Sequence, residues 1–367
     1  MTELKRYIDS LINEGIPYID VIATKDGKEL VRYYNGRGDV TGKEKLFLFS
    51  CTKPLTVTLA MNLIEKGLLS LDEPLEDIIP SFRDVFLVEN GVKRPPKTKI
   101  TVRHLFTMSA GLSYKIGMYP AESAYLSRGD KSPALAIAES FAKGALISEP
   151  GEKFIYSLCH DTLAAIIELR SGMRFSECMK KYIWEPLGMS DTRFGNRHED
   201  DVAELYFAYD SGKITPMKKE NILIYADGYE SGGAGLISTV EDYSKFTAAL
   251  SLGGIGANGK RILSESSVRA LYTPEIPLLA EDNGFTHVRE QEYYYGLGVR
   301  TRTKPTEWGL PVGEFGWDGA AGSYLSVDPV NKISVFIGMH MRGWTKIFKD
   351  KHLEIVKHIY RIAGIKP

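Results

Sequence analysis

A serine and a lysine three residues apart, Ser50 and Lys53, are the first pair in the sequence whose types and spacing suit catalysis. Positions three apart lie on one face of a helix, so this spacing places an amine within reach of the hydroxyl. The amine can then help to remove the hydroxyl proton and activate the oxygen as a nucleophile. A helix N-terminus also favours the negative charge that develops there. The pair therefore predicts a serine that forms an acyl-enzyme.

The spacing alone is weak evidence, because ordinary residue frequencies give roughly one or two such pairs by chance in a chain this long. A second pair, Ser140 and Lys143, lies inside the run ALAIAESFAKGAL, with no strand before it. We interpret that pair as a solvated helix face. Ser50 instead follows an apolar run and opens a helix whose first turn tolerates Pro54. This context favours Ser50 as the nucleophile.

The second candidate is Tyr156, in the run Tyr156-Ser157-Leu158. A turn at Pro150 and Gly151 precedes it, and a helical pattern follows it. A tyrosine beside a lysine can act as a general base if the positive neighbour lowers its pKa. The alternative is an ordinary packing role, since the chain has 20 tyrosines.

The third candidate is a glycine-spaced run over residues 315–329, FGWDGAAGSYLSVDP. Gly316, Gly319 and Gly322 would let the backbone approach a ligand closely. Such a loop beside a nucleophile can offer a backbone N–H to an oxyanion. The alternative is a tight hairpin with no role in chemistry.

Several other classes of site find little support. The run GGIGANGKR, residues 253–261, nearly matches a phosphate-binding loop, but Arg261 stands where Ser or Thr is needed. No Gly-x-Ser-x-Gly elbow occurs. The seven histidines form no HExxH or HxH pair, so neither a zinc site nor another cofactor is expected. Cys51, Cys159 and Cys178 form an odd set without a CxxC spacing, which indicates free thiols.

The charge balance limits the partners that can be expected. Lys and Arg number 46 and Asp and Glu number 47, which gives a formal net charge of −1. This balance draws the chain neither to nucleic acid nor to an anionic membrane. The first residues lack the apolar core of a secretory signal, and no window is apolar enough to span a bilayer. We expect a cytoplasmic protein that acts on a small-molecule ester or amide, and its oligomeric state stays open.

Hydrophobic periodicity outlines the elements. The first residues form an amphipathic helix, and a hairpin turns at Asp26 and Gly27. A helical block follows, strand-like runs return late, and residues 350–364 form a closing helix. This order predicts a mixed α/β lobe with a helical insertion. We place the first part of the lobe at 1–70, the insertion at 71–204 and the second part of the lobe at 205–367.

Taken together and in this order, the motifs resemble those of the serine β-lactamase and penicillin-binding-protein superfamily. The resemblance is closest to its class C-like branch and to the family VIII carboxylesterases. It implies an α+β fold, an antiparallel sheet flanked by helices with an inserted all-helical region. The stretches that carry it are SCTKPLT, ITVRHLFTMSAGLSY, FIYSLCHDTLAAIIELRSG, FSECMKKYIWEPLGMSDTRF, SGGAGLISTVEDYSKF and GWDGAAGSYLSVDP.

The resemblance also implies roles. Ser50 would attack the carbonyl carbon, while Lys53, held neutral by burial and nearby charge, and Tyr156 would move the proton. The backbone N–H groups of Ser50 and Ala320 would form the oxyanion hole. Water would then release the acid.

Two departures from the usual motifs bear on the substrate. The tyrosine motif usually ends in Asn, where this chain has Leu158, and the third motif usually begins with a cation, where it has Trp317-Asp318-Gly319. Both changes resemble esterase-like members, so we expect a carboxylesterase for small neutral esters with these four residues in the substrate site. The alternatives are a β-lactamase or D-amino-acid peptidase, or a catalytically silent binding protein. A compensating cation, with Arg342 the first candidate, would reverse the expected preference.

Overall fold

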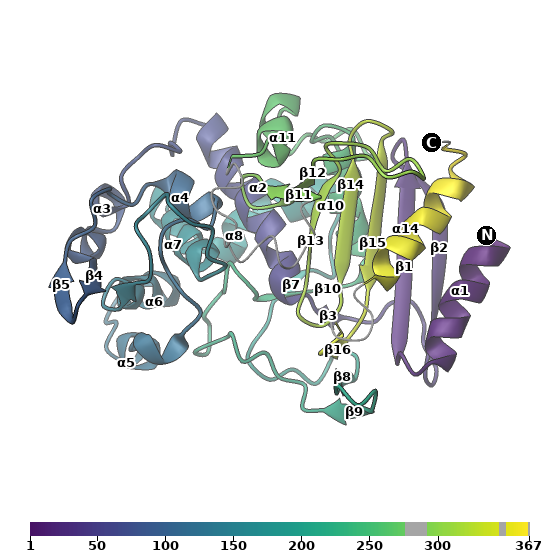
Figure 1. The fold of residues 1–367 in the computed structure, drawn as a ribbon, viewed down its shortest axis with the longest axis horizontal. Coiled ribbons are helices and arrows are strands. Elements are labelled where there is room, and N and C mark those ends of the chain that lie inside the picture. Colours follow the sequence, from purple (N-terminus) through teal and green to yellow (C-terminus); the bar gives the residue numbers. More distant parts are fainter. Residues whose placement is uncertain (276–291, 345–349, 366–367) are drawn as a thin grey trace.

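A seven-stranded antiparallel sheet forms the centre of the larger lobe (Figure 1). The computed structural model describes residues 1–275, 292–344 and 350–365. The strands follow the order β11-β12-β13-β14-β15-β1-β2 across the sheet. Their bounds are Tyr293–Tyr295 (β11), Arg300–Arg302 (β12), Phe315–Asp318 (β13), Tyr324–Asp328 (β14), Ile333–Gly338 (β15), Tyr18–Lys25 (β1) and Lys28–Gly36 (β2). The fold class expected from the sequence is confirmed.

The predicted N-terminal hairpin is confirmed. β1 and β2 pair antiparallel and are joined by Asp26 and Gly27, which both have positive φ, 50° and 74°. Two consecutive residues with positive φ give the turn whose twist matches that of the flanking strands, which is why an Asp-Gly pair suits it. β1 then pairs with β15, so the first and last parts of the chain share one sheet.

Helices cover both faces of this sheet. Helices α1 (Thr2–Asn13) and α14 (Lys351–Ile362), the two predicted terminal helices, pack together over one face (Figure 1). Their buried apolar residues join those of alternate positions on β1 and β15 in one cluster. Helix α10 (Val240–Ser251) packs against β1, β14 and β15 and belongs to the cluster on the opposite face.

The inserted region is largely helical, but it also contains a short three-stranded sheet in the order β5-β4-β6. It is therefore not entirely helical, while its predicted limits at 71 and 204 stay predictions. Its elements are α3 (Leu75–Ile78), β4 (Phe86–Glu89), β5 (Val92–Arg94), α4 (Val102–Phe106), α5 (Ala121–Leu126), α6 (Pro133–Phe141), β6 (Ala145–Leu146), α7 (Cys159–Ser171), α8 (Phe175–Met179), α9 (Glu185–Leu187) and β7 (Arg193–Phe194).

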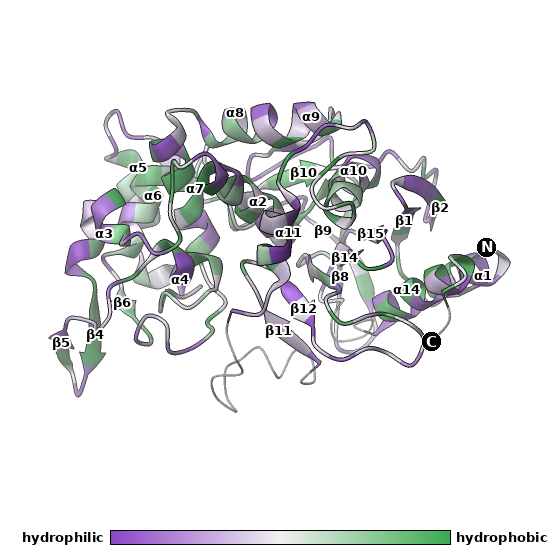
Figure 2. Cartoon of the chain, turned by 90° about the horizontal axis from the view of Figure 1, so that it is seen from above, coloured by the Kyte–Doolittle hydropathy of each residue, from purple (hydrophilic) through white to green (hydrophobic). Residues whose placement is uncertain are grey.

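The other described elements include the long helix α2 and two further three-stranded sheets, β3-β10-β7 and β16-β8-β9. They are β3 (Leu46–Phe47), the 3-10 turn η1 (Phe49–Cys51), α2 (Thr52–Glu65), β8 (Leu205–Ala208), β9 (Ile214–Met217), β10 (Leu236–Ser238), α11 (Glu265–Tyr272) and β16 (Met341–Arg342). Figure 2 shows hydrophobic residues gathered in α6 and α7 and interleaved with hydrophilic ones in α1 and α14. The buried apolar residues of the insertion belong to the same cluster as those on the α10 face of the sheet, so one core joins the two parts.

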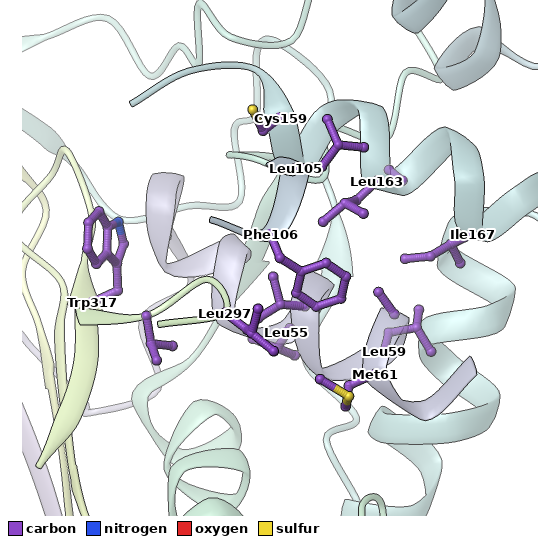
Figure 3. Close-up of a cluster of buried hydrophobic side chains, with 14 of the residues drawn as sticks. Leu55, Leu59, Met61, Leu105, Phe106, Cys159, Leu163, Ile167, Leu297 and Trp317 are labelled. Carbon is purple, nitrogen blue, oxygen red and sulfur yellow. The ribbon is translucent and has the colours of Figure 1, made fainter. Parts of the chain in front are cut away.

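Helix α2 is buried along nearly its whole length. Leu55 and Leu59 on this helix lie in one cluster with Phe106 of α4 and with Leu163 and Ile167 of α7 (Figure 3). A helix enclosed on all sides cannot expose a polar side chain to water, so a lysine on it must find its partners inside the protein. This is the setting of Lys53.

Candidate active site

A sharp turn carries Ser50 from strand β3 into helix α2. Phe49, the residue before it, has a φ of +46°, a left-handed conformation that is unusual for an aromatic residue and costs on the order of 1–3 kcal/mol. The Cys51 N–H donates to Leu48 O at 3.1 Å and closes the 3-10 turn. Ser50 keeps 9% of its surface exposed, whereas its neighbours in the turn are fully buried. The turn therefore presents one hydroxyl and buries the residues on both sides of it.

Lys53 is completely buried, and its Nζ touches three oxygens. Nζ lies 3.3 Å from Ser50 Oγ, 3.0 Å from Tyr114 Oη and 2.6 Å from Gly233 O. A carbonyl oxygen only accepts, so Lys53 must donate one N–H to Gly233. The hydroxyls of Ser50 and Tyr114 can each donate or accept, which leaves the direction of those two bonds free to change with the charge of the amine.

Burial lowers the pKa of Lys53 to about 8, but the nearby carboxylate of Asp161 opposes this shift, so the expectation that nearby charge helps to keep the amine neutral is wrong. A low-dielectric environment penalises the charged ammonium, so at pH 7, one unit below this pKa, about a tenth of the amine is neutral. A neutral amine donates two hydrogen bonds and accepts one. With Gly233 O and Tyr114 Oη as acceptors, its lone pair can point at Ser50. The arrangement therefore suits proton transfer from Ser50 to Lys53.

Tyr156 lies half-buried beside Lys53, with Lys53 Nζ 4.7 Å from the centre of its ring. The Ile155 N–H bonds to Met108 O at 2.7 Å and fixes the chain just before it. Burial raises the pKa of Tyr156, and hydrogen bonds from Ser50 and Trp317 only partly oppose this shift. Our expectation that a positive neighbour lowers this pKa is wrong in direction, because desolvation of the phenolate dominates. Tyr156 is a neutral phenol here.

The sequence analysis missed Tyr114 as a site residue. It closes the stretch ITVRHLFTMSAGLSY, and its hydroxyl contacts Lys53 Nζ although the two residues are 61 positions apart. Its ring lies 5.5 Å from that of Tyr156, so the two tyrosine rings lie next to each other beside the amine. Burial raises the pKa of Tyr114 well above its usual value. No spacing in the sequence marks this contact; the only signal was its place at the end of that stretch.

The glycine-spaced run forms a hairpin, β13 and β14, whose turn lies against the Ser50 turn. A Cβ at Gly319 would lie 2.3 Å from Leu48 O, so only glycine fits this close approach. The Trp344 indole N–H holds Gly319 O at 3.2 Å. Ala320 follows as an exposed residue at the start of the turn. The run is thus both a tight hairpin and a loop whose backbone comes close to the nucleophile turn. The role of the Ser50 and Ala320 amides as an oxyanion hole stays a prediction.

Trp317 uses its indole N–H within the site. The N–H donates to Tyr156 Oη at 3.1 Å, and the ring packs against both Tyr156 and Tyr295. Only 6% of its surface is exposed. Leu158 is 1% exposed and belongs to the hydrophobic core, whereas Asp318 is half-buried. The contacts with substrate expected of these residues stay predictions, and in this structure Leu158 offers a substrate almost no surface.

Arg342, the candidate compensating cation, lies close to the nucleophile turn. Its guanidinium is 5.8 Å from the centre of the Phe49 ring.

Cys51 is fully buried, and burial raises the pKa of its thiol. In the part of the chain that the structure describes, no group of three or more His, Cys, Asp or Glu side chains is placed to hold a metal ion.

Comparison with known proteins decides the family. The family model described as Beta-lactamase matches residues 4–357, nearly the whole chain. This chain belongs to the beta-lactamase family. Its expected enzyme class, a serine hydrolase, is confirmed at this level. None of its described helices combines the length and the apolar character needed to cross a bilayer.

Relatives of this beta-lactamase-family chain include both esterases and acyltransferases. It is 25% identical over 350 residues to esterase EstB of Burkholderia gladioli, covering 86% of this chain and 84% of that protein. It is 27% identical over 297 residues to the acyltransferase calJ of Penicillium decumbens, covering 74% and 70%. The solved structure of EstCE1, described as a hydrolase with promiscuous acyltransferase activity, matches with a TM-score of 0.79, 22% identity and 98% coverage of both chains. That structural likeness supports the fold.

Proposed function

We propose that this chain is an esterase that hydrolyses small neutral carboxylic esters through an acyl-enzyme on Ser50. The observation that supports this proposal most is the buried Lys53 amine, which contacts Ser50 Oγ and is oriented by Gly233 O. Its lowered pKa keeps a neutral fraction available near physiological pH. A base whose pKa lies near the operating pH combines a useful population with a useful proton affinity.

The proposed reaction has two halves. Ser50 Oγ attacks the ester carbonyl carbon and passes its proton to Lys53 Nζ, while the amides of Ser50 and Ala320 stabilise the oxyanion. The ester C–O bond then breaks, and the proton reaches the departing alkoxide through the Tyr156 hydroxyl. A water molecule repeats the sequence on the acyl-enzyme, releasing the acid and restoring Ser50. Tyr156 stays neutral at rest and relays a proton, in keeping with its raised pKa.

The preference for neutral esters rests on Trp317. It stands where related enzymes have a cation, and its single N–H is already bonded to Tyr156. A substrate carboxylate buried beside an indole without a partner costs several kcal/mol or must take up a proton. Arg342 is the group that could provide such a partner, so the test must include it.

The test compares kcat/KM for p-nitrophenyl butyrate with kcat/KM for nitrocefin, which carries a carboxylate. We expect the wild-type enzyme to be faster on the ester, Trp317→His to lower the ratio, and Arg342→Gln to leave it unchanged. A wild-type enzyme faster on nitrocefin would overturn the ester preference and favour the β-lactamase alternative. A ratio unmoved by Trp317→His would show that this residue does not set the preference.

Acyl transfer to an alcohol is a second candidate, and the relative named acyltransferase calJ favours it. In that case an alcohol in place of water would attack the acyl-enzyme and yield a new ester. Product analysis with p-nitrophenyl butyrate and benzyl alcohol separates the two. Mainly butyric acid supports hydrolysis, whereas benzyl butyrate in excess at millimolar alcohol would establish transfer.

Two further alternatives are tested by covalent labelling. A fluorescent phosphonate that leaves the folded protein unlabelled would favour a catalytically silent binding protein. Stable labelling by a fluorescent penicillin would favour a peptidase. We retain the predictions of a cytoplasmic protein with a small-molecule partner, without nucleic acid, membrane or cofactor.

A further inference from the structure

A buried carboxylate near Lys53 holds one loop in place. Asp161, in the first turn of α7, is 3% exposed. Its Oδ1 accepts hydrogen bonds from Tyr229 Oη at 2.7 Å, from Ser231 Oγ at 2.6 Å and from Gly233 N at 3.4 Å. Three donors on one oxygen suit an ionised carboxylate, which only accepts. All three belong to residues 229–233, so Asp161 ties this loop to α7.

The same loop orients the lysine. Gly233 O accepts from Lys53 Nζ at 2.6 Å, and Thr56 Oγ1 of α2 donates to Gly232 O at 2.7 Å. A Cβ on Gly233 would lie 2.4 Å from Asp161 Oδ2 and 3.3 Å from Lys53 Nζ. Only glycine fits between the two groups. Their charges therefore lie within the roughly 4–6 Å over which opposite charges shift each other's pKa.

Asp161 is the charged group that faces Lys53 in the described part of the chain. Burial raises the pKa of the neighbouring thiols and phenols and lowers that of the neighbouring imidazole, so these groups are neutral around pH 8. They are Cys51 of η1, Tyr114 after α4, Tyr156 before α7, Cys159 and His160 of α7, and Tyr229 of the loop, whose pKa burial also raises. The charge at this site is thus set by one carboxylate and one amine.

We infer that Asp161 is a positioning residue for Lys53: its charge sustains the amine as a base, and its hydrogen bonds hold the Gly233 carbonyl that orients the amine. This inference rests on the proposed function, in which Lys53 takes the proton of Ser50. Asp161 contacts neither Ser50 nor the reacting atoms in this account. It acts on Lys53 through the loop at residues 229–233 and through the electrostatic effect of its negative charge.

Removal of the charge should shift the pH dependence of activity. Lys53 works as a neutral amine, so kcat/KM rises as pH rises through the Lys53 pKa. Burial alone would lower that pKa further, because Asp161 is the largest influence opposing it. Asp161→Asn keeps the size and an acceptor oxygen but removes the charge. The acid limb should therefore move to lower pH by about one unit or more, and the weaker base should give a lower plateau.

The experiment measures kcat/KM for p-nitrophenyl butyrate from pH 5 to pH 10, with Ser50→Ala as the blank for spontaneous hydrolysis. The wild-type acid limb should have its midpoint near 8. Asp161→Asn should shift it downward, and Asp161→Ser, which is also neutral, should shift it in the same direction. Glu168→Gln is the matched control, since it removes a buried carboxylate of the same helix that accepts from Phe175 N–H at 3.0 Å. It should leave the midpoint unchanged.

A folded neutral variant with a lower plateau and the wild-type midpoint would overturn the inference, because a merely structural role predicts that result. A wild-type midpoint below 6 would overturn it without any variant, so misfolding of both variants leaves it testable. Covalent labelling with a fluorophosphonate distinguishes a failure of the proposed function from a failure of the role inferred for Asp161. If Ser50 is not labelled, the proposed function fails; if Ser50 is labelled and the midpoint does not move, only the role of Asp161 fails.

Discussion

The chain contains two Ser-x-x-Lys pairs in helical regions, and their surroundings differ completely. Ser140 of α6 is buried and donates its hydroxyl to Ile137 O at 2.6 Å, within its own helix. Lys143 lies past the end of that helix and is exposed. Ser50 instead keeps part of its surface open, and Lys53 is enclosed. The prediction of a solvated face was right for Lys143 and wrong for Ser140.

The difference shows that the surroundings of the lysine amine matter more for catalysis than the spacing between serine and lysine. An exposed ammonium keeps its proton near pH 7 and lacks a fixed orientation, so it is a poor base. The amine of Lys53 is desolvated, and Gly233 O fixes one of its N–H groups. The same four-residue pattern therefore gives a packing serine in α6 and a candidate nucleophile at the start of α2.

Substitution of the two serines should produce the largest difference in activity. Ser50→Ala is expected to lower kcat for p-nitrophenyl butyrate by several orders of magnitude, because it removes the attacking atom. Ser140→Ala should change kcat less than twofold, since its hydroxyl is bonded within the helix. Both variants should show the wild-type far-UV circular dichroism spectrum. If Ser140→Ala abolishes turnover and Ser50→Ala does not, the assignment of the two pairs is reversed.

Substitution of the two lysines should produce the second largest difference in activity. Lys53→Met preserves an unbranched buried side chain but removes the base, so we expect a loss of about 10²–10⁴-fold in kcat/KM. Lys143→Met, the same change at the exposed position, should leave kcat/KM unchanged. Equal effects of the two substitutions would contradict the claim that burial makes the amine a base.

The strand that leads to Ser50 depends on a buried neutral histidine. Phe47 N–H donates to His340 Nε2 at 3.0 Å, and burial lowers the pKa of His340 to about 4. The unfolded chain takes up this proton near pH 6.5, so the stability contribution is present above pH 6.5 and is lost as pH falls toward 4. The folding stability lost between these two pH values amounts to about 3 kcal/mol, at 1.36 kcal/mol per pKa unit.

Urea unfolding at pH 7 and pH 4.5 measures this contribution. His340→Gln should be less stable than wild type at pH 7 and should lose less stability on acidification. His198→Gln, at an exposed position after β7, is the control and should follow the wild-type pH dependence. A wild-type and a His340→Gln protein that lose the same stability would show that His340 does not stay neutral.

A smaller effect is expected from the hydrogen bond between Trp317 and Tyr156. Trp317→Phe keeps an aromatic ring but removes the N–H donor, at a cost of about 0.5–1.5 kcal/mol for a net hydrogen bond. We expect roughly a 2- to 10-fold lower kcat. Trp308→Phe, beneath α14 and packed edge-on against Tyr360, should have no effect on kcat. A wild-type kcat for Trp317→Phe would remove this bond from the account.

The smallest effect should come from Cys51, the neighbour of Ser50. Its thiol is buried, donates to Ser323 O at 3.5 Å and has a raised pKa, so it is a poor target for alkylation. Iodoacetamide at pH 7.5 should leave activity within about twofold of the untreated enzyme. Inactivation that follows alkylation of Cys51, and that Cys51→Ser abolishes, would contradict this prediction.

The sequence predicted the elements better than it predicted the site. The terminal helices and the hairpin at Asp26 and Gly27 follow from local periodicity and turn chemistry, which need no distant partner. Ser50 could be separated from Ser140 by local context alone. The partners of Lys53 could not be found in this way. Tyr114 lies 61 positions from it and Gly233 lies 180 positions from it, and only the packing of α7 and the loops brings them together.

The central claim is that Ser50 is the residue that becomes acylated, and peptide mapping after fluorophosphonate labelling tests it most directly. Trypsin should leave Ser50 in the peptide over residues 46–66, because Lys53 precedes Pro54 and resists cleavage there, and should leave Ser140 in the peptide over residues 132–143. We predict one adduct per chain, on Ser50, that is lost in Ser50→Ala and retained in Ser140→Ala. An adduct on any other residue, or stoichiometric labelling that survives Ser50→Ala, would contradict the account.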